Sequence, residues 1–329
     1  MRKKIFTSGA FVVFITSAWA QNTATLNQFG TEQTAGQTQT GNQQVSVVAQ
    51  RQADGPNVGN WATTHQTGTL PNTAIIQQNN GSQHNRSSVT QVGAEQWALA
   101  DQLGEVSLND VLIRQSGGNN RGAVFQQYMS HENNAALSQS GSGNEAELHQ
   151  RNQVSQNEIT VTQTGTDGSV FVRQSYGEVG SSAVVWQSGD RNEAELYQQS
   201  GSDNTATIDQ LTSGSDNYAF VYQGDTFAFS GSSGPVSGNT TTLTQRGSGN
   251  RAELWTMGSR NTLTVQQTGD ANFVRGVIGG QFSFDHVGKQ LGDDNVLTVS
   301  QTSSAGGAGH MARIQQMGQF NASTIQQAN

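Results

Sequence analysis

The chain has 329 residues and a formal net charge of −8, and only 33% of its residues are hydrophobic and 12% charged. Residues with amide side chains are frequent instead, with 41 Gln and 27 Asn. An ordinary globular enzyme of this length needs more apolar residues, and the lack of Cys excludes a disulfide scaffold. The acidic balance, with one Lys after residue 4, excludes a nucleic-acid binder, which requires clustered cations. Composition alone is compatible with disorder, so the residue pattern decides the fold class.

Residues 1–20 have the features of a secretory signal peptide. Arg2, Lys3 and Lys4 form a basic start, a short apolar run follows from Ile5 to Ile15, and residues 18–20 read Ala-Trp-Ala, a small-x-small cleavage site. The apolar run is well short of the ~20 residues that cross a bilayer. We therefore expect a mature chain of residues 21–329 that is secreted and does not insert into a membrane.

A repeat occupies the rest of the chain. Its unit is N-x-A-x-φ-x-Q-x-G, where φ is a large aliphatic residue, as in residues 133–141. From residue 85 to residue 192 the units begin alternately 11 and 13 residues apart. The period is therefore 24 residues and contains two similar halves, which is typical of a repeat architecture.

Each half of the repeat predicts one short strand. N, A, φ and Q stand at alternate positions, so they share one face of a strand, and polar residues face the other way. Gly, Ser and Asp between the halves are turn residues. Stacked periods predict an all-β fold, a β-solenoid of two facing parallel sheets with about 12–13 strand-turn-strand-turn rungs of 24 residues, spaced ~4.8 Å apart.

The regular 24-residue spacing of the amides predicts interior ladders that hold neighbouring rungs in register. An interior Gln can donate its NH₂ group to the next rung, which satisfies groups that cost ~1–3 kcal/mol when buried unpaired. One sheet is expected to hold Gln91, Gln115, Gln139, Gln163 and Gln187, and the facing sheet Gln102, Gln126, Gln150, Gln174 and Gln198. The ladder Asn residues are Asn85, Asn109, Asn133, Asn157, Asn120, Asn144 and Asn192.

Two stretches interrupt the repeat. Residues 224–238 include Phe227 and Phe229 and a Ser/Gly/Pro-rich run, and fit either a loop or one degenerate strand. Residues 273–294 keep Gln290 and Gly292 at repeat offsets, so we expect a hidden strand there.

The repeat resembles the curlin repeat of curli fibre subunits. Residues 139–150 and 187–198 match its core, Gln-x-Gly-x-x-Asn-x-Ala-x-x-x-Gln, fully. The resemblance implies a secreted bacterial protein that polymerises with itself into amyloid fibres at the cell surface, for adhesion and biofilm matrix. It also implies two partners, a nucleator subunit and a dedicated outer-membrane secretion channel. The chain has more than twice the repeats usual in that family, which leaves its role as major subunit, nucleator or paralogue open.

No group of residues predicts catalysis, a cofactor or a metal site. The six His residues lack metal-ligand spacing, and a solenoid enzyme would need acids and bases that converge in a groove. Outward Thr pairs such as Thr205/Thr207 and Thr262/Thr264 are not expected to recur rung after rung, which argues against an ice-binding face. A monomeric surface adhesin, with the solenoid as a spacer, is the alternative to a fibre subunit.

One outward face is expected to carry aromatic side chains. The unit that begins at Asn217 places Tyr218, Phe220 and Tyr222 at its outward positions. Tyr197 has the same offset in the unit two strands earlier, so Tyr197 and Tyr222 should be neighbours in one sheet. This patch is predicted either to make a surface contact or to be partly covered by Phe227 and Phe229.

Overall fold

The structure is a computed structural model that describes residues 12–16, 21–51, 58–211, 214–224, 236–278, 294–303, 309–316 and 320–328. Two compact units divide the chain, Met1–Val154 and Ser155–Asn329. Within the described residues both units consist of strands joined by turns and bends, without a helix. The predicted all-β fold is confirmed.

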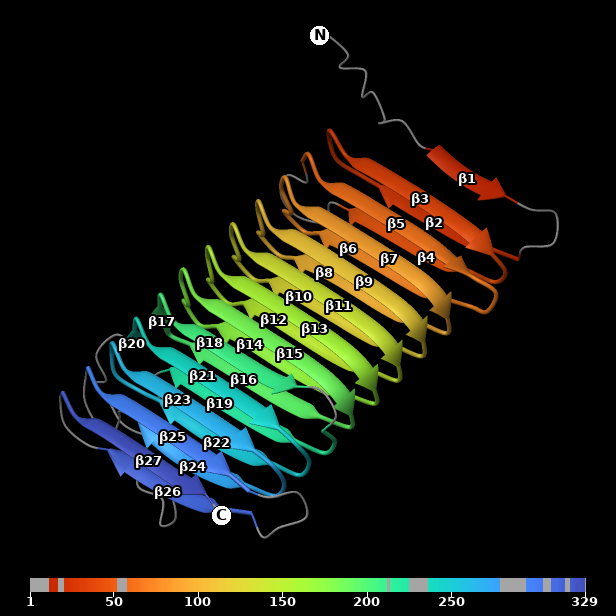
Figure 1. The fold of residues 1–329 in the computed structure, drawn as a ribbon. Helices are drawn as coiled ribbons and strands as arrows, with labels where there is room; N and C mark the ends of the chain where they lie inside the picture. The colour runs from red at the N-terminus through yellow and green to blue at the C-terminus, as the bar shows by residue number, and fades with distance from the viewer. Residues whose placement is uncertain are drawn as a thin grey trace, which may run out of the picture. The chain divides into compact units, whose positions relative to one another are not determined.

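The first unit contains two parallel sheets whose strands alternate along the chain (Figure 1). The odd-numbered sheet has the order β1-β3-β5-β7-β9-β11 and the even-numbered sheet the order β2-β4-β6-β8-β10-β12. The strands are β1 (Val12–Thr16), β2 (Thr23–Gln28), β3 (Thr34–Gly41), β4 (Val45–Arg51), β5 (Trp61–Gly68), β6 (Thr73–Asn79), β7 (Arg86–Ala94), β8 (Trp97–Leu103), β9 (Asp110–Gly118), β10 (Arg121–Gln127), β11 (Asn134–Ser142) and β12 (Glu145–Arg151).

The second unit repeats this arrangement. One sheet has the order β13-β15-β18-β21-β23-β25-β27, the other β14-β16-β19-β22-β24-β26, and the short β17 and β20 pair separately. The strands are β13 (Glu158–Thr166), β14 (Ser169–Ser175), β15 (Ser182–Asp190), β16 (Glu193–Gln199), β17 (Gly201–Ser202), β18 (Thr205–Leu211), β19 (Tyr218–Gly224), β20 (Val236–Ser237), β21 (Thr240–Arg246), β22 (Arg251–Thr256), β23 (Thr262–Thr268), β24 (Phe273–Ile278), β25 (Val296–Thr302), β26 (Met311–Gln316) and β27 (Ala322–Ala328).

The 24-residue period sets the register between stacked strands. In the first unit β9 pairs with β11 so that Ile113 lies beside Leu137, and β10 pairs with β12 so that Val124 lies beside Leu148. All four side chains are buried. Side chains alternate between buried and more exposed along the strands because successive residues of a strand face opposite ways. Each unit is thus a β-solenoid with one thin core between its two sheets, as the repeat predicted.

Left-handed backbone conformations make the sharp turns between the sheets. In the first unit Gly117 has φ +95°, and a Cβ placed on it would lie 2.0 Å from the carbonyl oxygen of Gly141 in the next rung. Glycine is required there because only a residue without a side chain tolerates both the φ angle and the close approach. The Gly of the repeat is therefore a packing requirement as well as a turn signal.

The described strands on either side of the two irregular stretches pair directly with one another. β18 pairs directly with β21 and β23 directly with β25, while β19 pairs with β22 and β24 with β26. The hidden strand expected in residues 273–294 falls on residues 279–293, which lie outside the described residues. Of that stretch residues 273–278 form β24, which is a regular repeat strand. Gln290, Gly292, Phe227 and Phe229 lie outside the described residues.

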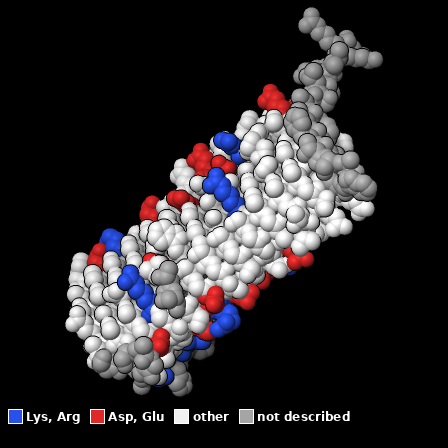
Figure 2. All heavy atoms as spheres, turned by 45° about the vertical axis from the view of Figure 1, so that its right-hand side comes forward, with Lys and Arg blue, Asp and Glu red and all other residues white. Residues whose placement is uncertain are grey.

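Direct pairing across the first irregular stretch also aligns outward threonines. Thr205, Thr240 and Thr262 are register partners in β18, β21 and β23, and so are Thr207, Thr242 and Thr264. The expectation that such pairs do not recur in successive rungs is wrong for these three strands. Figure 2 shows a face made mostly of uncharged residues, with Lys, Arg, Asp and Glu lying mainly along its borders.

Candidate functional site: amide ladders and sheet edges

Buried Gln side chains form continuous columns in the odd-numbered sheets. In the first unit Gln91 Nε2 donates to Gln115 Oε1 at 2.9 Å, and Gln115 Nε2 donates to Gln139 Oε1 at 2.8 Å. In the second unit Gln163 Nε2 donates to Gln187 Oε1 at 3.0 Å. All five side chains are at most 3% exposed. Each amide in these bonds points its NH₂ group toward the following rung, so the column has a direction.

The even-numbered sheets carry the facing columns. Gln102 donates to Gln126 and Gln126 to Gln150, both at 2.8 Å, in the first unit. Gln174 donates to Gln198 at 2.8 Å in the second unit. All five of these side chains are fully buried.

The second N–H of each amide joins the two sheets of a unit. Gln91 Nε2 also donates to the carbonyl of Thr73 in β6, and Gln102 Nε2 to the carbonyls of Arg86 and Asn109. A Gln side chain has two donors and one acceptor oxygen, which match one bond along the column, one across the core and one received. An aliphatic residue would remove these side-chain donors and leave the neighbouring Gln of the column without its hydrogen-bond partner.

Asn columns at the strand starts hold the turns in register. In the first unit Asn85 Oδ1 accepts from the backbone N–H of Asn109, Asn109 Oδ1 accepts from that of Asn133, and Asn120 Oδ1 accepts from that of Asn144. Asn109, Asn133 and Asn144 each lie 24 residues beyond their acceptor, as the period requires.

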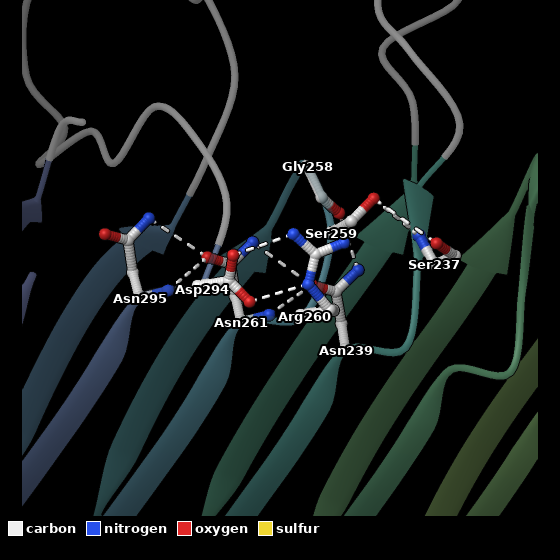
Figure 3. A network of polar contacts seen from close by, with 8 residues as sticks. All are labelled: Ser237, Asn239, Gly258, Ser259, Arg260, Asn261, Asp294 and Asn295. Carbon is white, nitrogen blue, oxygen red and sulfur yellow. Dashed lines mark hydrogen bonds and ion pairs between the residues drawn. The ribbon is translucent and has the colours of Figure 1, made fainter. Parts of the chain in front are cut away.

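The same column in the second unit is shown in Figure 3. Asn239 Oδ1 accepts from the N–H and Nδ2 of Asn261, and Asn261 Oδ1 from the N–H and Nδ2 of Asn295, at 2.9–3.1 Å. Beside the column, the Arg260 guanidinium makes two bonds, of 2.6 and 2.7 Å, to the carboxylate of Asp294. In the other sheet Asn192 Oδ1 accepts from the N–H of Asn217 at 3.0 Å.

In the second unit, one position of a Gln column and one position of an Asn column hold a different residue. Thr256 stands in register with Gln223 in the second unit, where a Gln is expected, and Gln223 donates instead to Thr241 Oγ1 at 3.0 Å. Ser181 stands in the Asn column after Asn157, whose Oδ1 accepts from the Ser181 N–H at 2.7 Å. The sequence shows Thr256 and Ser181 at positions where the repeat unit has Gln and Asn, but it does not show their compensating partners.

At its N-terminal edge the first unit has polar groups that lack the partners found in interior rungs. Gln39 Nε2 donates to Gln66 Oε1 at 3.0 Å, but Gln39 Oε1 is buried and accepts no hydrogen bond in the described part of the chain. Asn22 Oδ1 accepts from the Gln44 N–H at 2.9 Å, while its buried Nδ2 has no acceptor there. These are the positions that a preceding rung fills elsewhere in the columns.

β1 pairs with the outer edge of β3, with Val12 beside Gly36 and Thr16 beside Thr40. β1 lies wholly inside the predicted signal peptide. In the predicted mature chain, β2 and β3 are therefore the first strands of their sheets.

The C-terminal edge of the second unit exposes the end of the columns. Gln301 Nε2 donates to Gln327 Oε1 at 2.7 Å, and Gln327 Nε2 donates to the carbonyl of Met311 at 3.2 Å. Ile325 and Gln327 of β27 are half-buried, whereas Val299 and Gln301, their partners in β25, are fully buried. Nothing in the described residues pairs with the outer edge of β27, so its backbone groups and the Gln327 amide remain available.

The outward face of the even-numbered sheet in the second unit carries an aromatic stripe. Tyr197 and Tyr222 are register partners in β16 and β19, as predicted. The ring centroids of Phe171 and Tyr197 lie 5.4 Å apart, those of Tyr197 and Phe220 5.7 Å, and those of Phe220 and Trp255 5.1 Å. Phe171 and Trp255, which extend the stripe on either side, were not predicted.

Glu195 lies between the phenols of this stripe. Tyr197 Oη donates to Glu195 Oε2 at 3.1 Å, and Tyr218 Oη to Glu195 Oε1 at 3.2 Å. Burial and the Glu195 carboxylate raise the pKa of Tyr197 to about 12. Tyr197, Tyr218, Phe220 and Tyr222 are all half-buried, so the stripe is neither a core nor a freely exposed patch.

The fold and the columns define a class of protein, a repeat β-solenoid with interior amide ladders. The family model of the curlin associated repeat matches residues 180–211, 189–224 and 237–269. These segments are similar to the curlin associated repeat, which agrees with the resemblance seen in the sequence. Among curated proteins the comparison found no match. In the described part of the chain, no helix has the length and apolar character of a membrane span.

Proposed function

We propose that the mature chain is a secreted structural subunit that polymerises with copies of itself into curli-like amyloid fibres at the cell surface, where the fibres serve adhesion and biofilm matrix. The observation that carries this proposal is the complementarity of the two sheet edges. The first rung has an amide oxygen without a donor at Gln39, and the last rung has an NH₂ group at Gln327 that no following amide accepts from in the described residues.

Joining these edges would continue the strand alternation without a break. The mature chain begins with an even-sheet strand and then an odd-sheet strand, β2 and β3, and it ends with β26 and β27 in the same order. A second copy would place its β2 after β26 and its β3 after β27. The Gln327 NH₂ group would then meet the Gln39 oxygen of the next copy, which reproduces the bond between Gln91 and Gln115.

An uncapped parallel edge favours such addition. Unpaired N–H and C=O groups of an edge strand are a template for another strand, and stacked in-register strands with amide ladders are the structural basis of amyloid. Removal of residues 1–20 would uncover the edge of β3, so the same cleavage that accompanies export would activate the template. The chain then acts without catalysis, cofactor or metal.

The curlin repeats support two further partners, a nucleator subunit and a curli outer-membrane secretion channel. Both would recognise the repeat unit, because the stacked strands share one backbone register.

A matched pair of substitutions in β27 tests the end-to-end contact. Gln327→Glu places a carboxylate on the interior face in place of the NH₂ donor, whereas Gln326→Glu places it on the outward face of the same strand. We expect Gln327→Glu to slow fibre elongation at least about tenfold, since like oxygens would then face each other, and Gln326→Glu to leave it nearly unchanged. Thioflavin fluorescence and electron microscopy of the purified mature chain measure the growth.

Equal growth of the two variants would refute the edge contact. A native mature chain that stays monomeric over days would instead favour the alternative, a surface adhesin in which the solenoid is a spacer. Replacement of Ile325 together with Gln327 by charged or proline residues is a stronger version of the same block, because proline removes a ladder N–H.

A further inference from the structure

In one rung of the second unit, the Asn column holds a serine in place of an asparagine. Ser181 occupies the position between Asn157 and Asn204. The backbone N–H of Asn204 donates to Ser181 Oγ at 3.0 Å, where the other rungs use an Asn Oδ1. A serine hydroxyl has one donor and is shorter than an amide, so it leaves Asn204 Nδ2 without the acceptor that Asn residues elsewhere in the column receive.

The side chain of Glu178 supplies that acceptor. Glu178 is 0% exposed, and its Oε1 accepts from Ser181 Oγ at 2.5 Å and from Asn204 Nδ2 at 2.9 Å. Its Oε2 accepts from the backbone N–H of Gly201 at 2.7 Å. Glu178 and Ser181 together therefore rebuild the rung, with a carboxylate in the place of an amide.

Corresponding positions in the first unit hold neutral residues. Three residues before Asn85 and Asn133 stand Ser82 and Ser130, whose hydroxyls bond the Asn amides, and Val106 stands three residues before Asn109. The pair Ser130–Asn133 is thus the regular version of Glu178–Ser181. In both pairs the two residues lie three positions apart in the same kind of turn. The two rungs therefore differ only in their side chains.

The Glu178 carboxyl lies in surroundings that disfavour its charge. Three donors face it, from Ser181, Asn204 and the Gly201 N–H, and all three are neutral. The charged group that acts on it is Asp203, in the turn between β17 and β18, and Asp203 is itself a carboxylate. In the described part of the chain no cation forms an ion pair with Glu178. Burial raises the pKa of Glu178 above its ordinary 4.5, and the three hydrogen bonds only partly oppose this.

We propose that the Glu178–Ser181 rung is a proton-sensitive element that makes folding of the second unit more favourable in mildly acidic medium than near neutral pH. A carboxyl whose pKa is higher in the folded state binds its proton more tightly there. Its favourable contribution is therefore complete below the ordinary value of 4.5 and is lost as the pH rises through the raised pKa of the folded state. This concerns the fold of one chain and does not depend on fibre formation.

Restoring the regular rung tests the proposal. The double variant Glu178→Ser/Ser181→Asn copies the Ser130–Asn133 pair, and Glu178→Gln keeps the shape of the side chain but cannot ionise. Urea unfolding of the full mature chain, followed by tryptophan fluorescence between pH 4 and pH 7, gives the unfolding equilibrium constant of each protein. All other titrating groups are shared, so the ratio of the native constant to a variant constant isolates Glu178.

We expect this ratio to rise from pH 4 to pH 7, by about tenfold for each unit by which the Glu178 pKa exceeds its ordinary value. If the double variant fails to fold, Glu178→Gln provides the same ratio. Titration of the Glu178 carboxyl by NMR in the native chain gives an independent readout. A ratio that does not change with pH, or a Glu178 that titrates at or below 4.5, would overturn the proposal.

Discussion

At the residue scale, this protein replaces much of an apolar core with amides. A thin solenoid has little interior, so each rung relies on a few aliphatic side chains such as Ile113 and Leu137 together with the Gln column. Every interior Gln bond contributes ~0.5–1.5 kcal/mol, but each buried group left without its partner costs ~1–3 kcal/mol. The columns therefore specify register mainly because any slip leaves several groups unpaired at once.

Gln115→Leu should measure this penalty. The substitution removes the acceptor of Gln91 Nε2 and the donor to Gln139 Oε1 and to the Trp97 carbonyl. We expect the free energy of unfolding to fall by at least about 2 kcal/mol, whereas Arg114→Leu, on the exposed face of the same strand, should change it by less than about 0.5 kcal/mol. Urea unfolding of both variants measures the two losses of free energy. Equal losses would mean that the hydrogen bonds of the Gln115 amide do not contribute to stability.

Asp101 should weaken the first unit near neutral pH. Its side chain is 8% exposed, Oδ2 accepts from Gln127 Nε2 at 2.5 Å, and Oδ1 is buried without a partner in the described residues. Burial raises the pKa of Asp101 above its ordinary 3.8, so its contribution to stability is greatest below that value and declines as the pH rises through the raised pKa.

Asp101→Asn should consequently stabilise the chain at pH 7 by about 1 kcal/mol and have little effect near pH 3. The variant keeps an oxygen for Gln127 and cannot ionise. Unfolding midpoints of the two proteins at both pH values provide the measurement. A gain of the same size at pH 3 and pH 7 would show that ionisation is not the cause.

At the element scale, strands and turns are held by different constraints. Strands are specified by the alternation of buried and outward positions, and turns by residues that adopt positive φ. Gly104 and Gly117 both have positive φ in the first unit, +81° and +95°. A Cβ on Gly104 would lie 3.7 Å from its nearest neighbour, but one on Gly117 would lie 2.0 Å from a backbone oxygen of the next rung.

Comparison of Gly104→Ala with Gly117→Ala should separate conformational strain from rung contact. We expect Gly104→Ala to lose about 1–2 kcal/mol, since alanine is strained at positive φ. Gly117→Ala should lose clearly more, because the backbone of two stacked turns must also move apart. Thermal or urea unfolding distinguishes them. Similar losses of unfolding free energy in the two variants would mean that the close contact between the stacked turns adds no cost to the Gly117→Ala substitution.

At the scale of the whole molecule, stability is the sum of many similar rung contacts, as in other repeat proteins. Direct pairing of β18 with β21 and of β19 with β22 means that residues 225–235 interrupt the sequence without interrupting either sheet. In the same unit the Arg191–Asp216 and Arg260–Asp294 pairs tie successive turns at exposed positions. Because exposed pairs contribute little, the sheets and columns carry the fold.

Replacement of residues 225–235 by a short Gly/Ser turn should therefore leave the second unit folded. We expect the β-sheet circular dichroism to be preserved and the free energy of unfolding to change by less than about 1 kcal/mol, since shortening the chain between two strands has a small entropic effect. Loss of cooperative unfolding would instead show that the irregular stretch is needed for pairing of β18 with β21.

Much of the fold and of the candidate site could be predicted from the sequence. The alternation of two and the period of 24 are local properties of the chain, so they determine strands, facing sheets and the Gln columns. Register follows because a slip by one residue would turn every buried Gln outward. The pairing of Tyr197 with Tyr222 follows from the same repeat period, because the two residues hold the same position in units two strands apart.

Only the tertiary structure decided where the repeat could be interrupted and what compensates for an interruption. Asn204 and Asn239 are 35 residues apart yet adjacent in one column, and the period alone could not show which repeat units pair across residues 225–235. Glu178 acts on Asn204, 26 residues away, and Trp255 joins the aromatic stripe from 35 residues beyond Phe220. Such contacts depend on which rungs stack, because side chains from separate rungs meet only after the strands have paired.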